Sequence, residues 1–203
     1  MIYRIYRICG IIAAMIFFGC SSAHQISFTV PPMSANSAKH GFTVGIYAPD
    51  SLKNFVYSST LSGGLCKGHE FDLHIGSGII DALRNSLISV YDSVIMLDTP
   101  SAKLKDCFIP FIEIVNANAD FSPTGFSVMI KGSVNFRIQI VDIPNEREKR
   151  SRNVFTDDIK ISAENSGKGD DCHDAVTYLK KAGDLAMQAL RDSIVMRLMP
   201  DNK

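Results

Sequence analysis

Two short stretches hold most of the side chains that could bind a metal ion, and the first is Gly-His-Glu-Phe-Asp-Leu-His at positions 68–74. His69 and His74, with Glu70 and Asp72 between them, offer imidazole and carboxylate ligands suited to a divalent cation. Zinc proteases place His-Glu-x-x-His on one helix, whereas these histidines are five residues apart in a glycine-flanked stretch. We therefore predict a polar loop or strand edge here, with a metal site as the alternative.

The second stretch, Asp-Asp-Cys-His-Asp at positions 170–174, combines one thiol, one imidazole and three carboxylates. Consecutive side chains of a helix point around its axis rather than toward one point, so this density does not by itself make a ligand cage. We predict instead that Asp170 and Asp171 cap the start of a helix and complement its dipole. The sequence thus predicts no metal ion and no cofactor.

Motifs for nucleophilic catalysis are equally scarce. Ser77 stands between glycines in Ile-Gly-Ser-Gly-Ile, which resembles a nucleophile turn only faintly and fits a helix N-cap better. The sequence contains no Gly-x-Ser-x-Gly elbow and no phosphate-binding loop. We predict no catalytic residues and no enzyme activity. The alternative left open is a hydrolase whose cleft would gather His69, His74 and nearby acids.

The N-terminus combines positive charge, a short apolar run and a cysteine. Arg4 and Arg7 come first, and the mostly apolar residues 8–18 follow. These eleven residues are too few to span a bilayer core comfortably as a helix, which takes about 20 residues, but they fit the apolar region of a signal peptide. The run ends in Gly19-Cys20, where a plain secretory signal would end in small residues of the Ala-x-Ala kind.

This ending resembles the lipobox of bacterial lipoproteins, which reads Leu, a small residue, Gly or Ala, and then Cys. Gly19 and Cys20 match the lipobox, whereas Phe17 departs mildly and Phe18 departs more, since a small residue is usual there. The resemblance implies cleavage before Cys20 and attachment of a diacylglycerol and an acyl chain such as palmitate. Because Ser21 rather than Asp follows, it also implies the outer membrane of a Gram-negative bacterium. A short uncleaved anchor is the alternative.

This interpretation divides the chain into a signal peptide (1–19), a flexible tether (20–40) and a single α+β periplasmic domain (41–203). Ser, Ala, Asn and a Pro pair dominate the expected tether, around one short apolar patch at 26–30. The domain would meet the membrane only through the lipid on Cys20. With 21 basic and 21 acidic residues, the chain has no electrostatic footprint for nucleic acid.

Removal of the signal peptide would leave three cysteines besides Cys20, namely Cys66, Cys107 and Cys172. The periplasm is oxidising, so one disulfide among these three is expected, with one thiol left over. Three pairings are possible and the sequence does not choose among them. We prefer Cys66–Cys107, with three unpaired thiols as the alternative.

Hydrophobic periodicity predicts two long helices and several strands. Apolar residues recur at helical spacing over 76–94 and 172–199. Strict alternation over 126–142 predicts an unusually long strand of about 15 residues with one buried face, in which Gly132 is a candidate bulge. Shorter strands are predicted at 42–47, 54–60, 94–97, 107–115 and 153–164, with the strand at 94–97 fully buried, and with turns or loops at 116–125, 144–150 and 165–171.

This order predicts an α+β fold: an antiparallel sheet with a long β-hairpin and two helices packed on one face. The layout resembles that of the YajG-like and LptE-like families of small envelope lipoproteins, on the strength of residues 76–97 and 175–198. That resemblance implies a non-enzymatic accessory or scaffold subunit of an envelope assembly, with an envelope protein as partner. The alternative is a module that binds a lipid or other hydrophobic ligand in an apolar cavity between sheet and helices.

Overall fold

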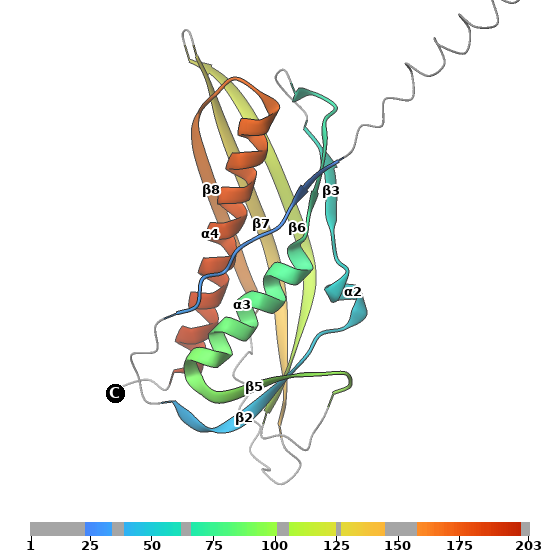
Figure 1. Ribbon diagram of the computed structural model, residues 1–203, viewed down its shortest axis with the longest axis vertical. Coiled ribbons are helices and arrows are strands. Elements are labelled where there is room, and N and C mark those ends of the chain that lie inside the picture. The colour runs from blue at the N-terminus through green and yellow to red at the C-terminus, as the bar shows by residue number, and fades with distance from the viewer. Residues whose placement is uncertain are drawn as a thin grey trace, which may run out of the picture.

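A computed structural model describes residues 23–33, 39–61, 66–100, 106–124, 127–144 and 158–199. This part of the chain forms three helices and two sheets (Figure 1). In chain order the elements are β1 (His24–Ile26), β2 (His40–Tyr47), α2 (Asp50–Lys53), β3 (Tyr57–Thr60), β4 (Glu70–Leu73), α3 (Ile75–Val90), β5 (Tyr91–Leu97), β6 (Asp106–Thr124), β7 (Ser127–Pro144), β8 (Ile159–Gly169) and α4 (Cys172–Leu198).

The five-stranded sheet has the order β5-β2-β6-β7-β8 and runs the length of the domain (Figure 1). Its longest strands, β6 and β7, form an antiparallel hairpin that is paired from Asp106↔Pro144 to Thr124↔Ser127. At about 3.4 Å per residue, each of these strands is roughly 60 Å long. The predicted α+β class is confirmed, and the long β-hairpin is present.

The hairpin and its return strand extend further than the turn-forming residues indicated. The prediction of a turn over 116–125 is wrong for residues 116–124, because β6 continues to Thr124. The polar residues of this part pair with β7, as in Asp120↔Lys131. Strand β8 likewise continues to Gly169 through a stretch expected to be a loop. Polar residues suit a strand whose outer face is solvated. The expected strand start at 153–157 lies outside the described residues.

The irregularity in the hairpin lies on β6, between Ile112 and Ile114, and the candidate bulge at Gly132 is absent from the β7 ladder. Gly132 instead permits a close helix–sheet contact. A Cβ atom built on it would lie 2.5 Å from the carbonyl carbon of Tyr178 in α4. A side chain at this position would therefore push the helix away from the sheet.

Strand β2 makes the five-stranded sheet mixed. It runs parallel to β5 along much of its length and parallel to β6 through Gly45↔Cys107 and Ile46↔Phe108. The antiparallel pairing that the sequence predicts therefore applies to β6, β7 and β8. The fully buried strand expected at 94–97 is an edge strand instead, with Ile95 and Met96 exposed by 40% and 46%.

Helices α3 and α4 pack on one face of this sheet and against each other (Figure 1), as predicted. Helix α4 lies along β7 and β8, whereas α3 contacts β5 and β2. The layer between helices and sheet is filled by side chains that are at most 3% exposed: Val44, Ile46, Leu83, Leu87, Ile130, Val134, Phe136, Ile138, Leu179, Leu190 and Ile194.

Residues 23–33 form a strap across the helices, so the expected flexible tether over 20–40 is wrong for this part of it. Ile26, Phe28 and Val30 are at most 9% exposed and belong to the core. The ring of Phe28 lies so close to Gly183 of α4 that a Cβ built there would be 1.8 Å from its Cε1 atom. The apolar patch within the polar stretch is therefore what makes these residues part of the fold.

Polar contacts fix the strap to both helices. The backbone N of Thr29 donates to Oδ1 of Asp184 in α4 at 2.8 Å, and Nδ2 of Asn85 in α3 donates to the carbonyl of Val30 at 2.8 Å. Farther along α4, Nη1 of Arg191 donates to the carbonyl of Pro31 at 2.5 Å. The strap thus follows α4 from its middle toward its end (Figure 1).

The smaller sheet has the order β1-β4-β3, with β1 parallel and β3 antiparallel to β4. It lies beside the upper half of the long hairpin in Figure 1. No helix within the described ranges is long and apolar enough to cross a membrane.

Candidate functional site

Cys20, the predicted site of lipid attachment, lies outside the described residues together with the rest of 1–22. The described chain begins at Ala23 and enters β1 at once, where His24 pairs with Phe71 of β4. The candidate anchor is therefore separated from the folded domain by only a few residues.

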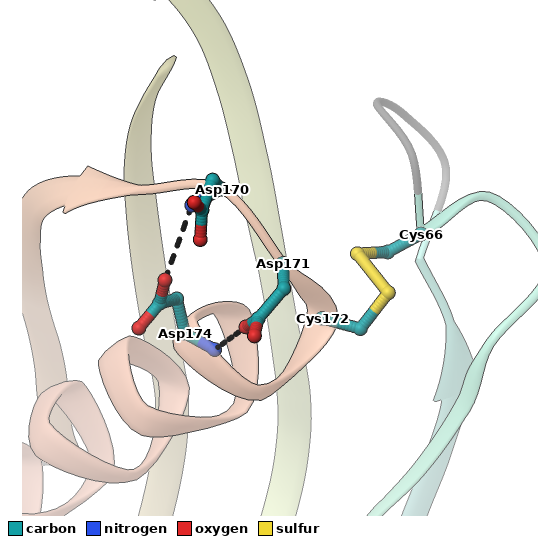
Figure 2. Close-up of a disulfide and its surroundings, with 5 residues drawn as sticks. All are labelled: Cys66, Asp170, Asp171, Cys172 and Asp174. Atoms are coloured by element: carbon teal, nitrogen blue, oxygen red, sulfur yellow. Dashed lines mark hydrogen bonds between the residues drawn. A yellow bond between two sulfur atoms is a disulfide. The ribbon is translucent and has the colours of Figure 1, made fainter. Parts of the chain in front are cut away.

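A disulfide joins Cys66, in the connection between β3 and β4, to Cys172 at the start of α4 (Figure 2). The two Cα atoms are 5.3 Å apart, and 106 residues separate the cysteines in sequence. The preferred pairing Cys66–Cys107 is wrong, because Cys107 lies near the start of β6, at the other end of the long sheet, as a free and buried thiol. The bond ties the smaller sheet to the helix layer.

The acidic residues next to this disulfide organise the start of α4 (Figure 2). Oδ1 of Asp171 accepts from the backbone N of Asp174 at 2.8 Å, and Oδ2 of Asp174 accepts from the backbone N of Asp170 at 3.1 Å. Asp171 is the N-cap, so the prediction of a capped helix start is confirmed.

Carboxylate oxygens of Asp170, Asp171 and Asp174 lie within 4.8 Å of one another. They are the only group of three or more His, Cys, Asp or Glu side chains of this kind among the residues with described positions. Capping accounts for the positions of Asp171 and Asp174 without a metal ion, because each accepts a hydrogen bond from a backbone N–H.

The histidine-rich stretch contains β4, which is the central strand of the smaller sheet with Phe71 and Leu73 buried, so the prediction of a polar loop or strand edge is wrong for these residues. Asp72 accepts from Oγ of Ser58 at 2.5 Å and from Nε2 of Gln25 at 2.7 Å, and Nε2 of His74 lies 2.7 Å from Oε1 of Gln25. The hydrogen bonds from Ser58 and Gln25 hold the pKa of Asp72 below its usual value, with a smaller contribution from the charge of His74.

This row contains serine, aspartate and histidine, but not in the arrangement of a nucleophilic triad. A triad requires the serine hydroxyl to contact the histidine directly. Here Ser58 donates to the carboxylate of Asp72, and Gln25 stands between that carboxylate and His74. His69 takes part elsewhere, with its ring stacked on His24 at 6.2 Å between centroids. The structure therefore does not gather His69 and His74 with acids around one reacting atom.

Ser77, the other candidate nucleophile, lies in the first turn of α3. The N-cap of this helix is His74 and not Ser77, and Oγ of Ser77 donates to the carbonyl of His74 at 3.0 Å. The neighbouring Gly76 is required by packing, since a Cβ built there would lie 1.9 Å from the carbonyl oxygen of Leu52 in α2. The glycines around Ser77 therefore reflect close packing more than a catalytic turn.

The sheet face opposite the helices, called here the outer face, carries an open groove of about 340 Å³. Its walls come from β6, β7 and β8, through Ile114, Asn116, Asn135, Phe136, Arg137, Lys160, Ile161 and Ser162, and its exposed surface is mainly apolar. Small-molecule sites are enclosed and mostly apolar. Because this groove is open rather than enclosed, it is better suited to contact with a protein surface.

Charged side chains on the outer face are largely paired. Nε of Arg137 lies 2.6 Å from Oε2 of Glu113 and 3.9 Å from Oδ2 of Asp158, as an ion pair without hydrogen-bond geometry at Nε. Nζ of Lys131 lies 2.8 Å from Oε2 of Glu164. These pairs are partly exposed, so each contributes little to stability.

Asp142 is the one described group whose pKa is raised strongly. It lies near the end of β7, on the face that the helices cover, by alternation with Ile138 and Ile140. Burial, and to a lesser degree the charge of Asp106, raises the pKa of Asp142 to about 7. Its Oδ1 atom is buried without a hydrogen-bond partner among the described residues.

Sequence reasoning missed three residues that hold the domain together. The sequence leaves Cys172 as one of three possible disulfide partners, and it predicts a tether at Phe28 and a bulge at Gly132. The strict alternation of Ile26, Phe28 and Val30 could have indicated burial of the strap. No local pattern identifies the partner of Cys172 or the helix above Gly132, since both contacts join distant parts of the sequence.

No family model and no curated protein matches this sequence. Among solved structures, a Xanthomonas campestris protein of the DUF330 family is similar with a TM-score of 0.51 and 8% identity, over 86% of this chain and 96% of that one. A minor lipoprotein of Acinetobacter baumannii has a TM-score of 0.43 and 8% identity, over 78% of this chain and 95% of that one. A homologue of the neuraminyllactose-binding hemagglutinin from Helicobacter pylori has a TM-score of 0.42 and 12% identity, over 86% and 92%. At these identities the first likeness shows a shared fold: this chain is similar in fold to the DUF330 protein.

Proposed function

We propose that this protein is a Gram-negative envelope lipoprotein, anchored through lipid on Cys20 to the periplasmic face of the outer membrane. Its role is that of a non-enzymatic accessory or scaffold subunit of an envelope assembly, with an envelope protein as partner. Residues 1–19 are its signal peptide, and the lipid is a diacylglycerol plus an acyl chain.

The disulfide between Cys66 and Cys172 is the observation that carries this proposal. Structural disulfides form and persist in oxidising compartments such as the periplasm and are rare in the cytosol. A folded domain closed by such a bond fits a chain whose first 20 residues resemble an export signal ending in a lipidated cysteine. The fold shared with the DUF330 protein is compatible with this role.

A non-enzymatic role fits the way the reactive side chains are used. Asp171 and Asp174 cap a helix, Ser58 and His74 belong to a cross-strand row, and Ser77 bonds within its own helix turn. In the arrangement described, none of these side chains pairs a nucleophile with a base. Their positions are explained by the fold.

The alternative, binding of a lipid or other hydrophobic ligand between sheet and helices, is less well supported. That layer is filled with buried side chains, and glycines such as Gly132 and Gly183 already bring neighbouring segments into close contact. Ligand pockets usually offer a few hundred Å³ of preformed space. A ligand there would require the helices to move away from the sheet.

The test is the mass of the protein extracted from membranes of a Gram-negative host, measured beside a Cys20→Ala variant. We expect a mass that corresponds to residues 20–203 plus a diacylglycerol and an acyl chain, and recovery in the outer-membrane fraction. The Cys20→Ala variant should lack both the lipid and the outer-membrane location. An unmodified full-length mass for the native sequence would contradict the proposal.

A further inference from the structure

The domain has two ends that differ in their distance from Cys20. The disulfide end contains Cys66–Cys172, His24 and the paired ends of β6 and β7 at Thr124 and Ser127. Figure 1 shows that α4 begins at this end. The remote end contains β5 and the last residues of α4. His24 belongs to the disulfide end because it pairs with Phe71 and its ring stacks on that of His69, three residues after Cys66.

Covalent geometry limits how far the disulfide end can lie from a lipid on Cys20. His24 is paired in β1 and follows Cys20 by four residues. At 3.3–3.6 Å per residue this chain reaches at most about 14 Å. A flexible tether extending to residue 40 would have reached about 70 Å and left the domain free to turn over. The strap removes that freedom, since it is bonded to α3 through Asn85 and to α4 through Asp184.

We propose that the disulfide end is the membrane-facing end of this protein and that the remote end projects away from the lipid surface. The inference rests on the proposed lipid anchor at Cys20. It deepens that proposal by assigning the partner of one surface: the headgroup layer of the membrane faces the end of β6 at Thr124, the start of β7 at Ser127, the Cys66–Cys172 bond and the start of α4.

The polarity of the two ends agrees with this orientation. Described and exposed residues at the disulfide end are polar or small, such as Lys67, His69, Ser122 and Asp170. Large apolar side chains that are exposed lie elsewhere, and several belong to the remote end or its approaches: Ile95, Met96, Val141, Met196 and Met199. A polar end can lie beside lipid headgroups without inserting, and the apolar residues remain accessible to a protein partner.

The orientation is tested with two matched labelling variants, Ser122→Cys near the end of β6 and Ser93→Cys on β5. Both serines are exposed, whereas Cys107 is buried and Cys66 and Cys172 are bonded. The full lipidated protein, labelled with a bimane fluorophore, is placed in phosphatidylethanolamine–phosphatidylglycerol vesicles that contain nitroxide-headgroup lipid. We expect quenching at position 122 to be at least threefold stronger than at position 93.

A third variant lengthens the connection between Cys20 and the domain by inserting twenty Gly and Ser residues between Ser22 and Ala23. We expect it to make quenching at the two positions nearly equal, because the domain can then rotate. Equal quenching of the two labels without the insertion, or stronger quenching at position 93, would overturn the orientation and leave the lipid anchor intact. A mass without lipid and failure to bind vesicles would instead overturn the anchor itself and the orientation with it.

Discussion

The two faces of the five-stranded sheet accommodate their side chains in different ways. On the helix-covered face, Ile130, Val134 and Ile138 are buried against α4, and Gly132 lets the backbone of that helix come close. On the outer face, alternate residues of the same strands are ion-paired or solvated, and Ile114 is 52% exposed. On the helix-covered face, close packing limits which side chains can be substituted. On the outer face, substituted side chains can extend into solvent, so changes are better tolerated.

The largest expected effect concerns the disulfide, which secures the smaller sheet to the helix layer. Replacing Cys66 and Cys172 together by alanine should lower the free energy of unfolding by about 4 kcal/mol, because the bond closes a long loop in the unfolded chain. The contrast is Cys107→Ala near the start of β6, which removes one buried thiol that forms no disulfide and should cost about 1 kcal/mol. Urea unfolding of the three proteins measures both values. Similar losses for the two changes would show that the bond is not a main constraint.

Adjacent residues of β7 provide a direct comparison of the two faces. Gly132→Ala should lower the free energy of unfolding by about 3 kcal/mol, because the new Cβ would collide with the backbone at Tyr178. Ser133→Ala, one residue later on the outer face, removes only a long hydrogen bond of 3.5 Å to the carbonyl of Asn118 and should change stability by less than about 0.5 kcal/mol. Thermal unfolding of both variants tests this difference. Equal shifts in unfolding temperature would mean that α4 can move to make room for the new Cβ.

Asp142 breaks the apolar pattern of the helix-covered face and should make stability depend on pH. Its carboxyl group titrates near 3.8 when unperturbed and near 7 in the fold. The folded state therefore holds the proton more tightly, so the contribution of Asp142 is fully present below about pH 4 and is lost as the pH rises through 7.

Asp142→Asn should remove this loss and stabilise the protein at pH 8 by about 1 kcal/mol, less than the full shift would give because the side chain is partly solvated. Unfolding is measured from pH 4 to pH 8, with Ser133→Ala as a control that adds no titrating group. Parallel pH profiles for Asp142→Asn and the native protein would show that this carboxyl group is accommodated without penalty.

The smallest effect is expected from the charges of the outer face. Glu113→Gln removes the nearest partner of Arg137, with Asp158 farther away at 3.9 Å. Because both side chains of the main pair are about one third exposed, the free energy of unfolding should fall by less than about 1 kcal/mol. The difference should shrink further in 1 M NaCl, where screening is strong. A loss of several kcal/mol would mean that this pair acts as part of a buried network.

Much of the fold could be predicted because its main elements carry local signals. The alternation over residues 126–142 predicted the long strand β7, and the apolar stripes predicted α3 and α4 with the cap at Asp171. The extension of β6 to Thr124 could not be predicted, because turn-forming residues there pair with an equally long partner strand. The prediction that residues 94–97 form a fully buried strand was wrong, because these residues belong to an edge strand. The local sequence does not indicate where in a sheet a strand will lie.

The sequence by itself determined the periodicities, and through them the α+β class, the long hairpin and the two-helix layer. It also determined the lipobox-like stretch on which the proposed anchor depends. Only the tertiary structure decided that Cys66 bonds to Cys172, that Phe28 packs on Gly183, and that Gly132 lies beneath α4. The physical reason is range: periodicity is set by neighbouring residues, whereas these contacts join segments distant along the chain and exist only once the layers have packed.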